Sequence, residues 1–289
     1  MAVAERGTKL ELRPLAPALG AEVLGFDLDA GMPDEAFAAI WAAFLDYKLL
    51  LFRGQTLDQH RHVAFARRFG PVDVHVMNQY QKDLLPELYF LSNLDEQGRP
   101  NGRHPDKGTL AWHTDGSWKR HTGQATMLYA IEVPAVGGET WWACQYAAYD
   151  ALSADEKRRY GAMRAIHNLD FSRTRRHPED PMNDAQRKAA PPVEHPVIRT
   201  HPDTGRKCVY LGDHAERIAG LSFEESRPIV DALNEKATQD AWVYRHKWRP
   251  GDFVVWDNRC LLHRATAYDA AAERRVVRRA TINGEEPQP

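Results

Sequence analysis

The chain of 289 residues carries 38 Lys or Arg against 40 Asp or Glu, a formal net charge of −2, so no basic bias points to nucleic acid or to a membrane surface. Hydrophobic residues make up 43% of the sequence, enough for a substantial core, yet no apolar run approaches the length of a membrane span. The N-terminus lacks the apolar core of a secretory signal, and we therefore expect a cytoplasmic protein.

The first 71 residues predict a mixture of short strands and amphipathic helices. Apolar residues recur at i, i+3, i+4, i+7 and i+8 from Phe37 to Leu45, the stripe of a helix that opens at Pro33. Asp58 is the expected N-cap of a second helix, which Gly70 ends. The elements expected here are strands at 10–14, 21–25 and 48–52 and helices at 33–45 and 58–69.

The rest of the chain predicts mainly strands. Two capping boxes, Ser153 with Glu156 and Ser222 with Glu225, mark the starts of helices. We see no internal repeat and no linker, so residues 1–289 are expected to form one domain, mainly β with peripheral helices, on a double-sheet core. Strands are expected at 88–91, 196–199, 208–211, 253–256 and 275–282.

Three further features complete this outline. Residues 95–108 form a polar loop rich in Gly and Pro, and residues 172–192 are rich in Arg, Pro and Asp without apolar periodicity. Loops this long are often lids, so we expect both segments to be candidate lids and the second to be a mobile excursion. Cys144, Cys208 and Cys260 lie far apart and form no CxxC pair, which argues against a zinc ribbon or a disulfide framework and favours small core residues.

His113 and Asp115 are separated by one residue, and His263 lies far downstream. Two imidazoles and one carboxylate can occupy one face of an iron ion, the arrangement typical of non-heme Fe(II) oxygenases. Residues i and i+2 of a strand point the same way, so the pair could aim at one metal. With 13 His and 40 acidic residues such triplets also arise by chance, as a polar strand end. The neighbouring Trp112 and the apolar run 125–131 indicate a buried region, where a metal would satisfy all three groups.

The run Arg274 to Ile282 contains four arginines. It could be a solvated edge strand or a nucleic-acid patch, but strand alternation splits it and places Arg275, Val277 and Arg279 on one face. The guanidinium fork binds carboxylates bidentately, and each charge-assisted hydrogen bond is worth roughly 1.5–3 kcal/mol. The face therefore suits an anion-binding cavity for a dicarboxylate, to which Thr140 could add a hydroxyl.

These stretches together resemble the TauD/TfdA family of Fe(II)- and 2-oxoglutarate-dependent dioxygenases. They occur in the family's order and span nearly the whole chain, which makes the match specific. The matching stretches are Trp112-His-Thr-Asp115, Val133-Pro, Gly137-Gly-Glu-Thr140, His201-Pro-Asp-Thr-Gly205, Trp256-Asp-Asn-Arg259 with His263, and Arg275 with Arg279-Ala-Thr-Ile282.

The resemblance implies a double-stranded β-helix, the jelly roll of cupin-like proteins. It implies Fe(II) bound by His113, Asp115 and His263, and O2 and 2-oxoglutarate as cosubstrates. Thr140 and Arg275 would hold the far carboxylate of 2-oxoglutarate, and Arg279 falls between cosubstrate and anionic substrate. The implied reaction hydroxylates a C–H bond and releases succinate and CO2. A carboxylate at Asp115 favours hydroxylation over halogenation.

The substrate implied is a small carboxylate or sulfonate. His75 and Tyr210 match substrate-contacting positions of the family, and Trp118 could be either a pocket wall or a core residue. The stretch 210–214 and the spacing from His263 to Arg275 look like the phenoxyalkanoate branch. Hydroxylation at a carbon that bears an ether oxygen, amine or sulfonate would be followed by cleavage of the product. The resemblance also favours a homo-oligomer, a dimer or tetramer.

Two alternatives stay open at this point. A metal-dependent hydrolase could use the same three ligands around zinc, although Arg275 and Arg279 would then have no clear role. A non-catalytic β-sandwich module that binds a small molecule could keep the three residues for structure alone. Oxygen uptake in the presence of Fe(II) and 2-oxoglutarate distinguishes the oxygenase from both.

Overall fold

The computed structural model describes residues 9–28, 32–74 and 85–289, and its largest element is a seven-stranded sheet. All neighbours in this sheet are antiparallel except β2 and β3, which are parallel. The strand order is β1 (Glu11–Pro14), β2 (Ala21–Leu24), β3 (Leu49–Phe52), β13 (Phe253–Asp257), β5 (Gly123–Glu132), β15 (Val276–Asn283) and β4 (Tyr89–Ser92).

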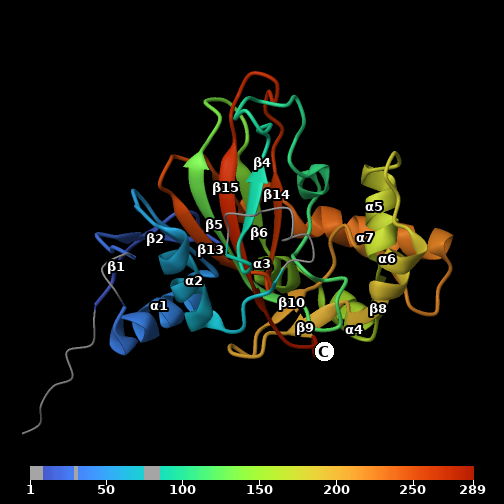
Figure 1. Ribbon diagram of the computed structural model, residues 1–289. Coiled ribbons are helices and arrows are strands. Elements are labelled where there is room, and N and C mark those ends of the chain that lie inside the picture. The colour runs from blue at the N-terminus through green and yellow to red at the C-terminus, as the bar shows by residue number, and fades with distance from the viewer. Residues whose placement is uncertain (1–8, 29–31, 75–84) are drawn as a thin grey trace, which may run out of the picture.

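A second, three-stranded sheet lies against the first, with β5, β13 and β15 beside β6 and β14 in Figure 1. Buried side chains of both sheets share one apolar cluster, in which Trp142 and Leu261 meet Leu49, Val254 and Trp256. These two facing sheets confirm the predicted double-sheet core and fit a jelly roll. The second sheet has the order β12 (Val243–His246), β6 (Thr140–Cys144) and β14 (Leu261–Ala265).

Smaller sheets and helices surround this core on both sides (Figure 1). Cys144, Cys208 and Cys260 are free and buried, as predicted. The remaining strands are β11 (Ala215–Ile218), β7 (Arg164–His167) and β8 (Val193–Pro196) in one sheet and β10 (Lys207–Val209) and β9 (Ile198–Thr200) in another. The helices after residue 100 are α3 (Gln145–Asp150), α4 (Ala154–Gly161), α5 (Leu169–Arg176), α6 (Asp184–Ala189), α7 (Phe223–Ala237) and the 3-10 turns η2 (Lys107–Leu110) and η3 (Asp240–Trp242).

Helices α1 (Asp34–Tyr47) and α2 (Gln59–Phe69) confirm the apolar stripes read from the sequence. Phe44 of α1 and Phe69 of α2 pack edge to face with ring centroids 5.3 Å apart, in the cluster that covers the large sheet. Asp58 caps α2 by accepting a hydrogen bond from the backbone N–H of Arg61 (2.8 Å), as predicted. The two predicted capping boxes are also present, at α4 and α7.

The segment 172–192, in which the sequence showed no helical periodicity, contains the end of α5 and all of α6. Both helices are short and polar and begin at asparagine caps, Asn168 and Asn183. Caps rather than an apolar stripe define them, so a search for periodicity misses them.

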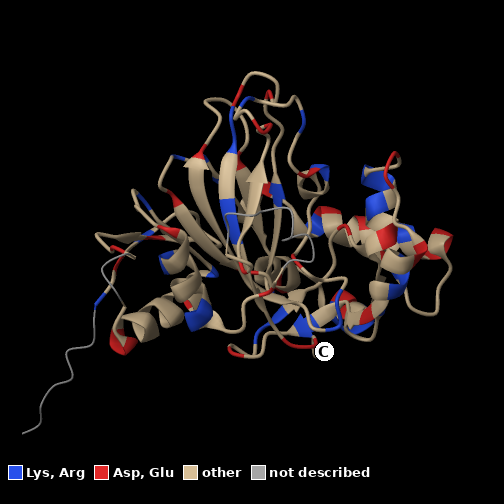
Figure 2. Ribbon diagram, in the orientation of Figure 1, with Lys and Arg blue, Asp and Glu red and all other residues tan. Residues whose placement is uncertain are grey.

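Basic and acidic positions are interleaved along most of the chain in Figure 2, whereas β15 carries basic positions among largely uncharged strands. Among the described residues, no helix is long and apolar enough to cross a membrane.

Candidate metal and cosubstrate site

Two segments 150 residues apart meet through a backbone pair at His113 and His263. The N–H of His113 donates to the carbonyl of His263 (2.9 Å), and the N–H of His263 donates to the carbonyl of His113 (2.7 Å). His263 lies on β14, but His113 forms an isolated bridge rather than part of the strand that we predicted. This bridge, not strand alternation, brings the two imidazoles together.

The three predicted metal ligands come together in a buried cluster. The ligand atoms of His113, Asp115 and His263 all lie within 4.8 Å of one another, and the two imidazole centroids are 4.2 Å apart. His113 Nε2 lies 3.7 Å from Asp115 Oδ1, and His263 Nε2 lies 3.7 Å from Asp115 Oδ2. Two imidazoles and a carboxylate converging in this way could hold a metal ion.

The protonation states also suit metal binding. His113 Nδ1 lies 2.8 Å from the carbonyl oxygen of Ala111, so Nδ1 donates and Nε2 presents its lone pair. Burial lowers the pKa of His113 and holds that of His263 well below the usual range, so both rings are neutral at pH 7. Burial alone would raise the pKa of Asp115, but the guanidinium of Arg279 and the hydrogen bond from Thr126 favour the carboxylate, and the pKa lies below its ordinary value.

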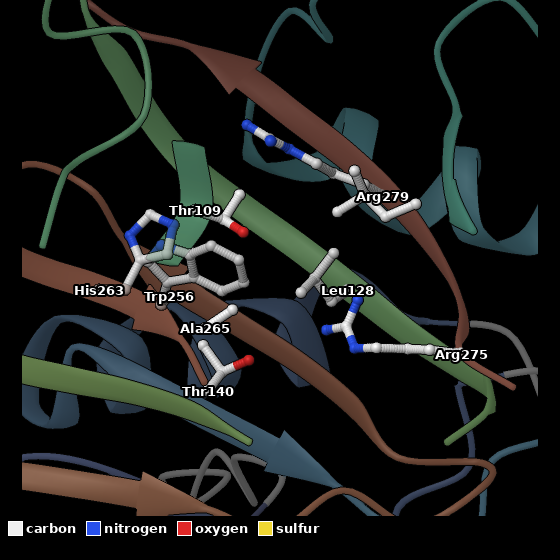
Figure 3. A pocket seen from close by; sticks show the side chains of 9 residues that line it. Thr109, Leu128, Thr140, Trp256, His263, Ala265, Arg275 and Arg279 are labelled. Atoms are coloured by element: carbon white, nitrogen blue, oxygen red, sulfur yellow. The ribbon is translucent and has the colours of Figure 1, made fainter. Parts of the chain in front are cut away.

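A pocket adjoins His263. Figure 3 shows His263 and Trp256 on one side of it and the guanidinium of Arg275 on the other, with Thr140 and Leu128 between them. Strands of both sheets contribute its walls, so the pocket opens between the two layers of the core. The lining residues are Leu91, Thr109, Leu128, Thr140, Trp256, His263, Ala265, Arg275 and Arg279.

Arg275 is only 4% exposed, yet no carboxylate of the described residues pairs with its guanidinium, and its Nε is buried without a hydrogen-bond partner. Its backbone N–H is held by Asn93 Oδ1 (2.8 Å). Thr140 Oγ1 accepts from Trp248 Nε1 (3.0 Å), so the hydroxyl proton of Thr140 is free to point elsewhere. An unpaired buried cation beside a hydroxyl forms a receptor for an anion.

The glycine pair before Thr140 makes room for this corner of the pocket. Gly137 has φ +75°, and a Cβ there would lie 2.4 Å from the carbonyl oxygen of Ala267. Gly138 has φ +65°, and a Cβ there would lie 2.9 Å from Pro134 Cγ. The Gly-Gly turn is therefore a steric requirement of the chain path that leads into β6.

The predicted alternation from Arg275 into β15 is confirmed. Arg275 and Arg279 line the pocket, whereas Arg278 points to the opposite face and donates from Nη2 to the carbonyls of Leu57 (2.6 Å) and Asp58 (2.8 Å). Arg279 reaches the metal-ligand cluster, since its Nη2 lies 2.9 Å from Asp115 Oδ1.

The predicted substrate residues lie elsewhere or outside the described residues. Tyr210 is 3% exposed and its ring stacks on His167, with centroids 5.6 Å apart. Trp118 is half-buried, with the ammonium of Lys119 5.3 Å from its ring. Neither lines the pocket of Arg275. His75 falls outside the described residues.

Several residues near the site were not selected from the sequence. Trp256 packs on His263 with centroids 4.8 Å apart, and His214 lies 6.4 Å from His113 by the same measure. Burial lowers the pKa of His214 to about 3, so this ring is neutral as well. Trp256 stands in a motif that matched the family, a signal that could have been used. Thr109 and Leu128 line the pocket through tertiary packing alone, which leaves no mark in the sequence.

The comparison with known proteins agrees with this geometry. Residues 11–281 match the family model described as taurine catabolism dioxygenase TauD, TfdA family. The chain is 39% identical over 276 residues to the alpha-ketoglutarate-dependent 2,4-dichlorophenoxyacetate dioxygenase of Cupriavidus pinatubonensis, covering 93% of this chain and 96% of that one. It is 34% identical to the (S)-phenoxypropionate/alpha-ketoglutarate-dioxygenase of Sphingobium herbicidovorans, with 95% of each chain covered.

The fold is also similar to solved structures. AAD-2, solved in complex with Mn(II) and N-oxalylglycine, superposes with a TM-score of 0.87 at 32% identity, covering 97% of this chain and 99% of that one. These likenesses favour the oxygenase over the hydrolase and the non-catalytic binding module. The chain therefore belongs to the TauD/TfdA family and is a 2-oxoglutarate-dependent dioxygenase that requires Fe(II) and O2.

Proposed function

We propose that His113, Asp115 and His263 bind the Fe(II) ion and that Arg275 and Thr140 bind the distal carboxylate of 2-oxoglutarate. The observation that carries the second assignment is the buried guanidinium of Arg275, which no carboxylate of the described residues neutralises. A dicarboxylate that reaches from Arg275 toward His263 would supply that charge, and the pocket joins these two residues. The donor set of the triad fits a divalent iron ion with open positions.

In this assignment the protein binds and orients, while bound iron, O2 and 2-oxoglutarate supply an oxidation that hydroxylates a substrate C–H bond and yields succinate and CO2. The hydrogen bond to Ala111 fixes the ring of His113 with Nε2 available. Asp115 stays ionised because Arg279 and the hydroxyl of Thr126 favour its charged form. Apolar walls such as Leu91, Leu128 and Ala265 exclude water from the pocket.

We propose a small carboxylate as the substrate, with aryloxyalkanoates the first class to test. Arg279 supports an anionic substrate, because it borders both the pocket and Asp115 and keeps part of its side chain, 24%, exposed. An aromatic ether in the substrate is supported by the relatives named as 2,4-dichlorophenoxyacetate and (S)-phenoxypropionate dioxygenases. Hydroxylation of the carbon that bears the ether oxygen gives a hemiacetal, which collapses to a phenol and a carbonyl compound, so cleavage would follow the oxidation.

The test is succinate release with Fe(II), 2-oxoglutarate and a panel of aryloxyalkanoates, alkyl sulfonates and alkyl sulfate esters. We expect aryloxyalkanoates to stimulate succinate release most strongly and to yield a phenol in equal amount. Stimulation by sulfonates alone would overturn the substrate class but not the metal and cosubstrate assignments. Absence of 2-oxoglutarate turnover with every compound, even uncoupled, would count against the site as assigned.

We also propose that 95–108 and 172–192 act as lids of one domain. Two contacts between the segments support this: Lys107 Nζ lies 3.3 Å from Glu179 Oε1, and His177 Nε2 lies 3.9 Å from Asp106 Oδ1. Limited proteolysis with and without Mn(II) and N-oxalylglycine tests it, since a closed lid should resist cleavage. Unchanged cleavage within both segments would reject the proposal.

Three further predictions concern the substrate wall, the assembly and the location of the protein. His75, Trp118 and Tyr210 are proposed to contact substrate, and alanine variants should raise the KM for substrate while leaving that for 2-oxoglutarate unchanged.

A homodimer or tetramer is proposed and light scattering would measure its mass. A cytoplasmic location is proposed and cell fractionation would test it.

A further inference from the structure

Asn258 lies in the turn between β13 and β14, where every polar group that it carries has a partner. It is 1% exposed. Its carbonyl oxygen accepts from Thr114 Oγ1 (2.6 Å), and its backbone N–H donates to the carbonyl of Gln124 (2.9 Å). These bonds join the turn to the segment that carries His113 and Asp115 and to the start of β5.

The side-chain amide of Asn258 has only one orientation that satisfies its neighbours. Oδ1 lies 2.9 Å from Trp256 Nε1 and 3.4 Å from the backbone N of Asp115, and both of these groups can only donate. The oxygen must therefore face them, which turns Nδ2 toward Thr126 Oγ1 at 2.9 Å.

This orientation decides where the hydroxyl proton of Thr126 points. The amide nitrogen only donates, so Thr126 Oγ1 accepts from it and sends its single proton to Asp115 Oδ2, 2.6 Å away. Asp115 thus receives a directed hydrogen bond at Oδ2, while Arg279 Nη2 approaches Oδ1 at 2.9 Å. Contacts to both oxygens fix the plane of the carboxylate.

Two further contacts matter for the hydrogen bonds of Asn258. One links them to an imidazole, and the other shows why they need a glycine nearby. Trp256, which Asn258 holds through Nε1, packs on His263 with ring centroids 4.8 Å apart. Gly123 lies against both partners: a Cβ there would be 2.6 Å from the carbonyl oxygen of Asp115 and 3.3 Å from Asn258 Nδ2. The approach of Asn258 to Asp115 therefore requires a residue without a side chain at position 123.

We propose that Asn258 is the positioning residue of the metal centre: its amide orients Asp115 through the Thr126 hydroxyl and holds Trp256 against His263. The proposal rests on the metal ligands assigned above. It gives a role to the third residue of Trp256-Asp-Asn-Arg259, a motif for which the sequence suggested none. Groups that hold a ligand in this way typically change metal affinity or activity 10- to 100-fold when they are replaced.

The experiment measures Co(II) affinity and the visible absorption of bound Co(II), without oxygen, in four variants of the full chain. Asn258→Asp keeps the acceptor for Trp256 and Asp115 but draws the Thr126 proton away from Asp115. Thr126→Val removes the hydroxyl at nearly constant volume, and Thr126→Ser restores it. His113→Ala removes an assigned ligand outright.

We expect Asn258→Asp and Thr126→Val to weaken Co(II) binding about 10- to 100-fold and to alter its spectrum, with Thr126→Ser close to the unmodified protein. If Asn258→Asp does not fold, the Thr126 pair decides. Unchanged Co(II) affinity and spectrum in Thr126→Val would overturn the proposal, even if its Tm fell. If His113→Ala also bound Co(II) normally, the failure would lie in the ligand assignment instead.

Discussion

Two buried clusters among the described residues have donor sets that suit a metal ion, but their histidines present opposite ring nitrogens for binding. His113, Asp115 and His263 form one; His201, Asp257 and Cys260 form the other, with ligand atoms likewise within 4.8 Å. In the first cluster Nδ1 of a histidine faces a carbonyl, which leaves Nε2 with a lone pair. In the second, Nδ1 of His201 faces backbone N–H groups of the next residues, so Nε2 carries the proton.

The polar groups of the second cluster are bound to each other and to a neighbouring arginine. His201 Nε2 donates to Asp257 Oδ2 (2.9 Å), and Arg259 binds both oxygens of Asp257 from Nε and Nη2 (2.8 Å each). Burial also raises the pKa of the Cys260 thiol well above its usual range, so it keeps its proton. Both clusters thus contain a buried histidine and a buried aspartate, and the tautomer of that histidine and the charge pairing of that aspartate distinguish the open cluster from the closed one.

Removal of one imidazole from each cluster should give the largest difference between the two, in Co(II) binding. We expect His263→Ala to abolish stoichiometric Co(II) binding and to reduce 2-oxoglutarate turnover below detection, because two donors hold the ion poorly. His201→Ala should still bind one Co(II) per chain, although with lower Tm. Calorimetric titration of both variants measures this, and the reverse pattern would reassign the metal to the second cluster.

The arginines beside the two clusters also differ, since Arg259 has a carboxylate partner, whereas no carboxylate in the described part of the chain pairs with Arg275. Arg275→Ala should raise the KM for 2-oxoglutarate about 100-fold, the effect of about 3 kcal/mol of charge-assisted hydrogen bonds. Co(II) affinity should stay the same. Steady-state kinetics measures the effect, with Arg278→Ala as the control from the opposite face of β15. An unchanged KM in Arg275→Ala would show that the carboxylate binds elsewhere.

Arg259→Met should lower the free energy of unfolding, because Arg259 neutralises the buried carboxylate of the second cluster. It leaves Asp257 charged and buried without its main partner, and breaking such a pair costs about 3–5 kcal/mol. Urea unfolding measures this free energy. Arg274→Met, which removes an exposed ion pair with Glu132, should change it little. Equal losses in the two variants would mean that burial is not what makes Arg259 matter.

A buried histidine outside both clusters should give the smallest effect. His167 is fully buried, neither of its ring nitrogens has a hydrogen-bond partner among the residues that the structure describes, and burial holds its pKa well below 6.5. Below pH 6.5 the unfolded chain takes up a proton that the folded chain refuses, so stability falls as pH falls, by up to about 1.4 kcal/mol per pH unit.

The variant His167→Phe removes that difference in proton uptake. Between pH 7 and pH 5.5 the free energy of unfolding should fall less steeply in His167→Phe than in the unmodified protein. His121→Phe, at an exposed position, should keep the original slope. Parallel slopes in all three proteins would show that His167 is not the group that takes up the proton.

Local signals explain which parts of the fold were predictable. Helices α1, α2, α4 and α7 carry a stripe or a cap within one segment, so their own residues specify them. Strands β6, β12 and β14 depend on pairing among segments about 100 residues apart, and the pattern alone did not reveal β12 or β14. Residue 113 was wrongly placed in a strand because a single bridge suffices to orient it.

The candidate site divides in the same way. Arg275 and Arg279 could be placed on one face because strand alternation is a local rule. The role of Asn258 and the closure of the second cluster depend on which way an amide or an imidazole is turned. Partners from distant segments fix those orientations, and no spacing within the sequence encodes them.

The alternation of β15 constrains how this enzyme could be diversified. Arg275, directly before β15, and Arg279 face the pocket, while Arg278 points the other way and binds the start of α2. Insertion or deletion of a single residue between Arg275 and Arg279 would place the two guanidinium groups on opposite faces of the chain, so that only one of them could face the pocket. Engineering of new substrate preference should therefore alter the connecting segments and leave the length of this strand untouched.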